Sequence, residues 1–88
     1  RACARARRAL EAKRVAYAAA IHAADGATTA KPHLALARAT LELVRAGGRG
    51  SLDRAIASCR RARRLGAAES ADQIEAALVA LRQARSAP

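Results

Sequence analysis

Apolar residues recur along this chain at the three- and four-residue spacing of amphipathic helices, in four successive runs. The spacing predicts helices over about 2–24, 32–46, 52–65 and 71–85. The run at 32–46 carries two apolar stripes, and a helix that is apolar on two sides packs against two neighbours. The pattern therefore predicts an all-α fold with four helices in two αα-hairpins, as a small helical bundle or a two-repeat αα-solenoid-like array. We expect residues 1–88 to form a single helical domain.

Glycine, proline and serine mark the ends of these runs. Three glycines each follow a helical run and are expected in the left-handed conformation that closes many helices: Gly26, Gly47 and Gly66. Pro32 suits the first turn of a helix, where its missing N–H is no loss. Ser51 and Ser70 are candidate N-caps, because a serine hydroxyl can accept a bond from an orphan backbone N–H.

A weak internal repeat is visible, because a shift of 40 residues aligns Gly26 with Gly66 and Leu41 with Leu81. The stretch GATTAKPHLALA at 26–37, and the alternation of short glycine turns with Ala/Leu helices, resemble idealised helical-repeat designs over about residues 10–85. The resemblance implies a scaffold and no particular activity. The chain departs from such designs in its arginine-rich surface and its two cysteines. A natural domain encoded by high-GC DNA is the alternative origin.

The composition limits the types of residue that can form the core. Apolar residues make up 52% of the 88 residues, with one Tyr and no Phe, Trp or Met, so the core must consist of Leu, Ile, Val and Ala. Tyr17 lies on the apolar stripe of the first helix, and its hydroxyl will need a partner. No apolar run approaches the roughly 18–20 residues that span a membrane. We expect a cytoplasmic or recombinant soluble protein with no membrane partner.

The net charge of +10 changes the functional expectation. Six basic residues lie in the first 14 positions and seven lie in 45–64, each region holding one acid. This predicts affinity for polyanions, and if the first and third helices are neighbours the two regions form one patch. Without interleaved aromatic residues, binding would be dominated by phosphate contacts. The candidate polyanion-binding residues are Arg5, Arg7, Arg8, Arg60, Arg61 and Arg64.

The arginine run at 60–64 can also be interpreted as a solvated helix face. At about 100° per residue, Arg60, Arg61 and Arg64 fall opposite the apolar stripe. Arg63 continues that stripe, so we expect its stem to lie on apolar surface while its charged end reaches water. All four lie near the helix C-terminus, where cations are favourable. The solvated face is the main interpretation, and a phosphate-binding face is the alternative.

Two histidines and two cysteines are the remaining candidates. A hairpin brings His22 and His33 to the same end of the fold, where they are weak ligand candidates for a metal or a small molecule. Asp25 is the one acid nearby, so we expect no tight metal site. The register of the predicted helices separates Cys3 from Cys59 by about 20 Å along the helix axis, which predicts no disulfide between them.

No serine, threonine or cysteine has an evident base beside it in the sequence. We therefore expect a non-enzymatic helical scaffold or binding module, designed or natural, without a cofactor. The alternative is a non-sequence-specific nucleic-acid-binding protein that uses the arginine-rich helix faces. A pocket at the histidines is the weaker alternative. An acidic protein, a nucleic acid and a second copy docked through the first helix all stay open as partners.

Overall fold

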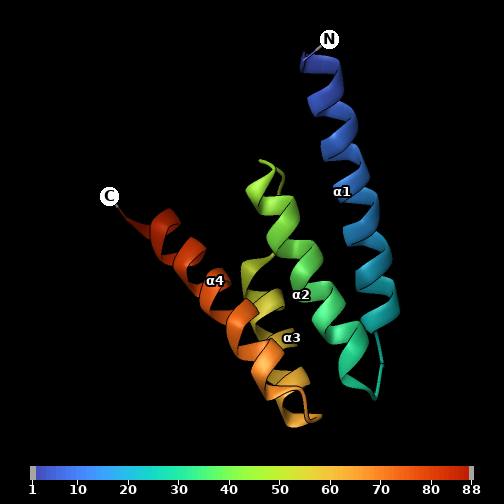
Figure 1. Cartoon of the computed structure of the whole chain (residues 1–88), viewed down its shortest axis with the longest axis vertical. Helices are drawn as coiled ribbons and strands as arrows, with labels where there is room; N and C mark the ends of the chain where they lie inside the picture. The colour runs from blue at the N-terminus through green and yellow to red at the C-terminus, as the bar shows by residue number, and fades with distance from the viewer. Residues whose placement is uncertain (1, 88) are drawn as a thin grey trace.

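The computed structural model describes residues 2–87, and these form four α-helices joined by short turns, without a strand. They are α1 (Ala2–Ala24), α2 (Ala30–Arg45), α3 (Leu52–Arg64) and α4 (Ala68–Ser86). Each helix packs on the next along the chain, and α2 also contacts α4. Helix α2 lies at the centre, with α1 on one side and α3 and α4 on the other (Figure 1). The prediction of an all-α fold with four helices is confirmed.

The two apolar stripes of α2 face different neighbours. Ala37 and Leu41 belong to the main core, which α3 and α4 complete with Leu52, Ala55, Ile56, Cys59, Ala62, Ala71, Ile74 and Leu78. Leu36 and Leu43 are also buried, but they lie outside that cluster. Leu36 lines a cavity together with residues of α1, and Leu43 lies against the turn that touches Leu10 of α1. The expectation that this helix packs on two sides is confirmed.

The three turn glycines have the predicted left-handed backbone, with φ of 72°, 93° and 102° at Gly26, Gly47 and Gly66. At the end of α3 the Gly66 N–H bonds to the Arg63 carbonyl, and the next N–H bonds to the Ala62 carbonyl. The end of α2 has the same pair of bonds around Gly47. These are Schellman motifs, which satisfy carbonyls that the helix leaves without partners.

Two helix starts differ from the prediction. Helix α4 begins at Ala68 and Ala67 is its N-cap, so the prediction of Ser70 as N-cap is wrong. The Schellman turn at Gly66 already directs the chain into the next helix, which leaves Ser70 inside the first turn. Helix α2 begins at Ala30, two residues before Pro32, because any of the first four N–H groups of a helix is dispensable. Ser51 is an N-cap as predicted, since its hydroxyl accepts a bond from the Arg54 N–H.

Helix α1 is attached at one side only. Among the described helices it contacts α2 and neither α3 nor α4. The Tyr17 hydroxyl adds one link, accepting a 3.1 Å bond from the Ser51 N–H in the turn before α3. The first turns of α1 extend past the ends of the other helices, and residues 3–9 are exposed (Figure 1). The first and third helices are therefore not neighbours, and the condition for one continuous basic patch is not met.

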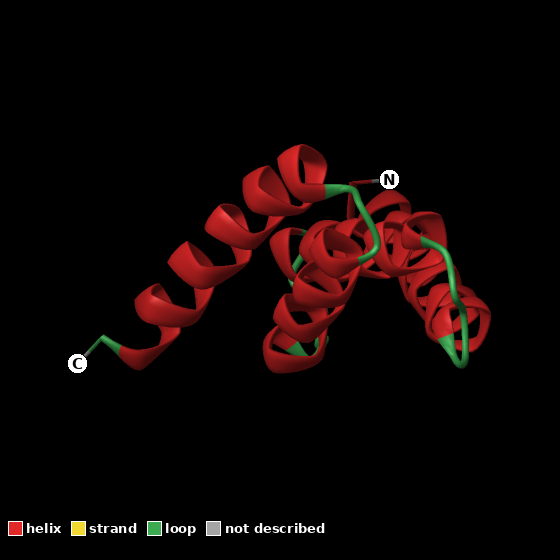
Figure 2. Cartoon of the chain, turned by 90° about the horizontal axis from the view of Figure 1, so that it is seen from below, coloured by secondary structure: helices red, strands yellow, loops and turns green. Residues whose placement is uncertain are grey.

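The weak 40-residue repeat holds for the turns and not for the packing. Gly26 and Gly66 both close the first helix of a hairpin with positive φ. However, Leu41 is buried in the core, whereas its counterpart Leu81 is half-buried. Helix α4 lies at the edge of the array, inclined to α3, and covers one side only (Figure 2). The second hairpin is therefore not a copy of the first.

The turn between α2 and α3 leaves no room for a side chain at Gly48, which is buried. A Cβ there would collide with Leu43 and would stand 3.0 Å from Leu10 Cδ1. We expect Gly48→Ala to destabilise the fold by about 1–3 kcal/mol, the usual effect of overpacking a core. Urea unfolding measures the change. The matched control is Gly50→Ala, whose added Cβ would lie no closer than 3.2 Å to another side chain, at Thr40 Cγ2. Equal free energies of unfolding for the two variants would contradict the prediction.

Candidate functional site

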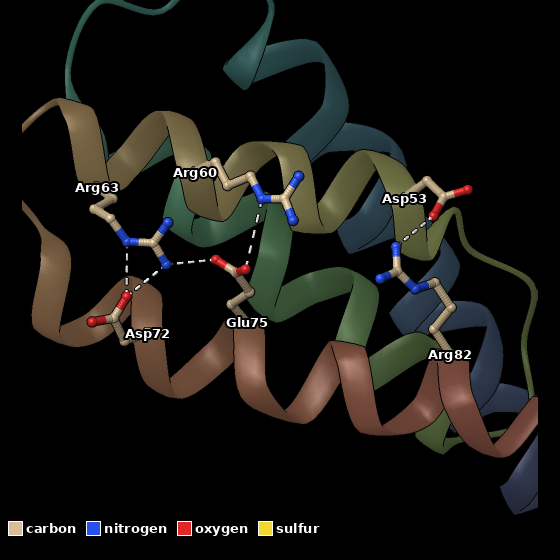
Figure 3. A network of polar contacts seen from close by, with 6 residues as sticks. All are labelled: Asp53, Arg60, Arg63, Asp72, Glu75 and Arg82. Carbon is tan, nitrogen blue, oxygen red and sulfur yellow. Dashed lines mark hydrogen bonds and ion pairs between the residues drawn. The ribbon is translucent and has the colours of Figure 1, made fainter.

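Helices α3 and α4 are joined by ion pairs that centre on Arg63 (Figure 3). Its Nε and Nη2 donate to Asp72 Oδ1 at 2.8 and 2.6 Å, and Nη2 also donates to Glu75 Oε1 at 2.6 Å. Glu75 in addition faces Arg60, with 3.7 Å between Oε2 and Nε. The Glu75 side chain is 17% exposed, so its carboxylate is largely withdrawn from water and is satisfied by two arginines.

A fourth pair extends this contact to the other end of the hairpin, where Arg82 Nη1 donates to Asp53 Oδ1 at 3.1 Å. In Figure 3 the labelled side chains of one helix face those of the other along the α3–α4 interface. Hydrogen bonds to Glu75, and then to Asp72, raise the pKa of the Arg63 guanidinium above its ordinary value. Arg63 therefore joins α3 to α4 through charge-assisted hydrogen bonds.

These contacts change the interpretation of the arginine run. Arg63 does differ from its neighbours: its side chain is 39% exposed, and its charged end bonds at the surface to two carboxylates that the sequence pattern did not predict as partners. Arg60 is exposed and also has an acid partner, which makes it a poorer phosphate ligand than the sequence indicated. Arg61 and Arg64 are exposed, and within residues 2–87 neither has an ion pair. The solvated-face interpretation therefore fits these two.

The other candidate arginines lie on the projecting end of α1. Arg5, Arg7 and Arg8 are exposed, and the structure gives them no acidic partner among the described residues. The nearest acid in sequence, Glu11, lies 3.5 Å from Arg14. The six candidate residues consequently form two separate surfaces, one on α1 and one on α3.

The two histidines do come together. Both line an open cavity of about 430 Å³ at the α1–α2 turn, whose other lining residues are Ile21, Ala24, Asp25, Leu36, Arg54 and Ser58. His33 Nε2 lies 2.9 Å from the Ala27 carbonyl, and because a carbonyl can only accept, Nε2 must carry the proton. Within residues 2–87 no group of three or more His, Cys, Asp or Glu side chains is placed to hold a metal ion. No pattern in the sequence indicated Arg54 and Ser58, which reach the cavity only through the packing of α3.

No disulfide joins the two cysteines, as the helix register predicted. Cys3 is exposed on the projecting part of α1, and Cys59 is buried in the core. Burial, with a smaller contribution from the charge of Glu75, raises the pKa of Cys59 to about 11. Cys59 is therefore a packing residue with little thiolate at neutral pH.

None of the helices in the described part of the chain is both long and apolar enough to cross a membrane. Comparison with known proteins finds no family model, no curated protein and no solved structure that matches this chain. The function of the chain must therefore be inferred from its own side-chain geometry and charge.

The ion pairs predict unequal roles within the arginine run. Arg63→Gln removes the partner of a largely buried carboxylate, so we expect the melting temperature to fall by about 5 °C or more. Arg61→Gln is the matched control on the same helix, and we expect its free energy of unfolding to stay within about 0.5 kcal/mol of the parent. Calorimetry of both variants measures the difference. Equal melting temperatures would show that the Arg63 contacts contribute nothing to the α3–α4 packing.

Cys59 predicts a loss of stability in alkali. Its folded pKa, about 11, lies above the reference value of 9.0, so the stabilisation is complete below pH 9.0 and is lost as the pH rises towards 11. Relative to Cys59→Ala, the parent should lose up to about 2–3 kcal/mol across this range. Urea unfolding in a Cys3→Ser background measures it, and groups that titrate in both proteins cancel in the difference. A difference that does not vary with pH would contradict the prediction.

Proposed function

We propose that this protein is a non-enzymatic helical binding module that presents α1 to nucleic acid. One observation carries the proposal: the first turns of α1 project from the fold and expose Arg5, Arg7 and Arg8, with no acidic partner among the described residues. Two arginines of the other basic region are, in contrast, already engaged by the acids of α4. The projecting end of α1 is thus the most available concentration of positive charge.

The shape of α1 suits a groove with phosphates on both sides. At about 100° per residue, Arg5 and Arg7 point about 160° apart, and Arg8 lies between them. A helix with its side chains is about 10–12 Å across, close to the roughly 12 Å width of the major groove of DNA. Alanines at positions 4, 6 and 9 keep this segment slender. The arginines can then reach phosphates on both strands, which an acidic protein surface would not offer.

The rest of the fold supports α1 as a scaffold. Helix α2 packs on α1 with one side and on α3 and α4 with the other, so the projecting turns continue a helix that is anchored over its second half. The resemblance of the chain to idealised helical-repeat designs fits this scaffold role. The only tyrosine, Tyr17, is engaged with Ser51, so no aromatic side chain is available to stack on bases. Binding should therefore depend on phosphates and not on base sequence.

A salt series on a DNA duplex tests the proposal. We expect the parent to bind at about 50 mM salt, with a steep fall of log K against log salt. The triple variant Arg5→Gln/Arg7→Gln/Arg8→Gln should reduce the slope by about three units. The matched control, Arg38→Gln/Arg45→Gln/Arg85→Gln, removes the same charge from exposed positions elsewhere and should change the slope less.

Three outcomes would contradict the proposal. Absence of binding by the parent at about 50 mM salt would exclude a phosphate-dominated interface. Equal losses in the two triple variants would show that net charge, and not α1, determines binding. Binding to polyglutamate without binding to DNA would identify an acidic protein as the partner.

A further inference from the structure

The cavity at the α1–α2 turn collects groups from three helices and holds one full charge of each sign. Asp25 comes from the end of α1, His33 from the first turns of α2, and Arg54 from the first turn of α3. Ile21 and Leu36 supply apolar surface. The volume of about 430 Å³ lies within the range of small-molecule sites.

Both charges stand where the helix ends disfavour them. Arg54 is in the first turn of α3, near the positive end of the helix dipole, and Asp25 follows the last residue of α1, near its negative end. Neither has an ion pair within the described residues: Asp53, the acid next to Arg54, bonds to Arg82 instead. These two charges therefore do not serve helix stability, and each is available to a ligand.

Ser58 is the second sign of a binding site. It is 8% exposed and lines the cavity, and because no buried side-chain N or O atom of the described residues lacks a partner, its hydroxyl must be accessible from the cavity. The hydroxyl of Thr40, the other buried hydroxyl residue, donates a 2.8 Å hydrogen bond to the Leu36 carbonyl one turn earlier. The Ser58 hydroxyl is thus accessible to an occupant of the cavity. On His33 the Nε2 proton is used by the Ala27 carbonyl, which leaves Nδ1 as an acceptor.

We propose that this cavity binds a small zwitterion, a free α-amino acid with an apolar side chain. Its carboxylate pairs with the Arg54 guanidinium, which suits carboxylates by geometry and charge. Its ammonium pairs with Asp25, and its side chain covers Ile21 and Leu36. Asp25 would repel a simple anion, and Arg54 would repel a simple cation. Only a ligand with both charges therefore satisfies the site. The site is independent of the α1 arginines.

L-phenylalanine is the probe, followed by two-dimensional NMR of the full chain. We expect saturable binding with Kd of about 1 mM, a value reasonable for so small a ligand, with shifts confined to the cavity residues. Arg54→Gln and Asp25→Asn should each weaken binding about tenfold. Arg61→Gln removes an exposed arginine of α3 that does not line the cavity, and binding should not change. Ser58→Ala should weaken binding less than Arg54→Gln.

Two analogues assign each charge to its partner. N-acetyl-L-phenylalanine lacks the ammonium, so Arg54→Gln should weaken its binding, whereas Asp25→Asn should strengthen it by removing the repulsion between the two carboxylates. L-phenylalanine amide lacks the carboxylate and should show the reverse. The proposal is overturned if no saturation occurs below about 20 mM, if Arg61→Gln and Arg54→Gln weaken binding equally, or if one variant weakens the binding of both analogues. DNA binding by the α1 arginines is measured separately, so either result stands without the other.

Discussion

The packing of α2 on two sides is the constraint on which this fold depends. One side, with Ala37 and Leu41, completes the core made with α3 and α4, and the other carries Leu36 and Leu43. Without aromatic residues other than Tyr17, the chain can bury area only by bringing small and branched side chains close together. The missing side chain at Gly48 and the hydrogen bond between Tyr17 and Ser51 matter for this reason. They determine how closely α1, and the turn between α2 and α3, approach α2.

Charge is distributed according to this packing. The acids Asp53, Asp72 and Glu75 all lie at the α3–α4 interface, and each of them engages an arginine from the facing helix. The chain has only seven acids against seventeen basic residues, so using three of them at one interface leaves the excess elsewhere. Much of it lies on the projecting turns of α1, far from these acids in the fold. The separation follows from the order of packing, because α1 touches neither α3 nor α4.

Local rules predicted the helix ends well, and interactions between helices account for the errors. A left-handed glycine is a local event, so Gly47 and Gly66 could be assigned from sequence. The prediction of Ser70 as an N-cap was wrong because the turn at Gly66 already directs the chain into α4.

The ion pairs were missed although a signal existed. Arg63 and Asp72 are equally far from the midpoint of the hairpin between residues 67 and 68, and the same holds for Arg60 with Glu75 and for Asp53 with Arg82. Antiparallel helices with equal rise bring such positions to the same height, so opposite charges in mirror positions predict contacts. The cavity residues Arg54 and Ser58 carried no comparable signal, since they reach the cavity that the histidines line only through the packing of α3.

The two proposed sites lie at opposite ends of α1, which is about 35 Å long for its 23 residues. At the N-terminal end positive charge is concentrated and no acid partner is described before Glu11, whereas at the C-terminal end Asp25 and Arg54 balance each other. We therefore expect one end to attract polyanions over a distance that salt controls, and the other to select a small ligand by contact. Coupling between them would need an element with two arrangements, and α1 is one uninterrupted helix packed on α2. The two ends are accordingly expected to bind independently, with α2 as their common support.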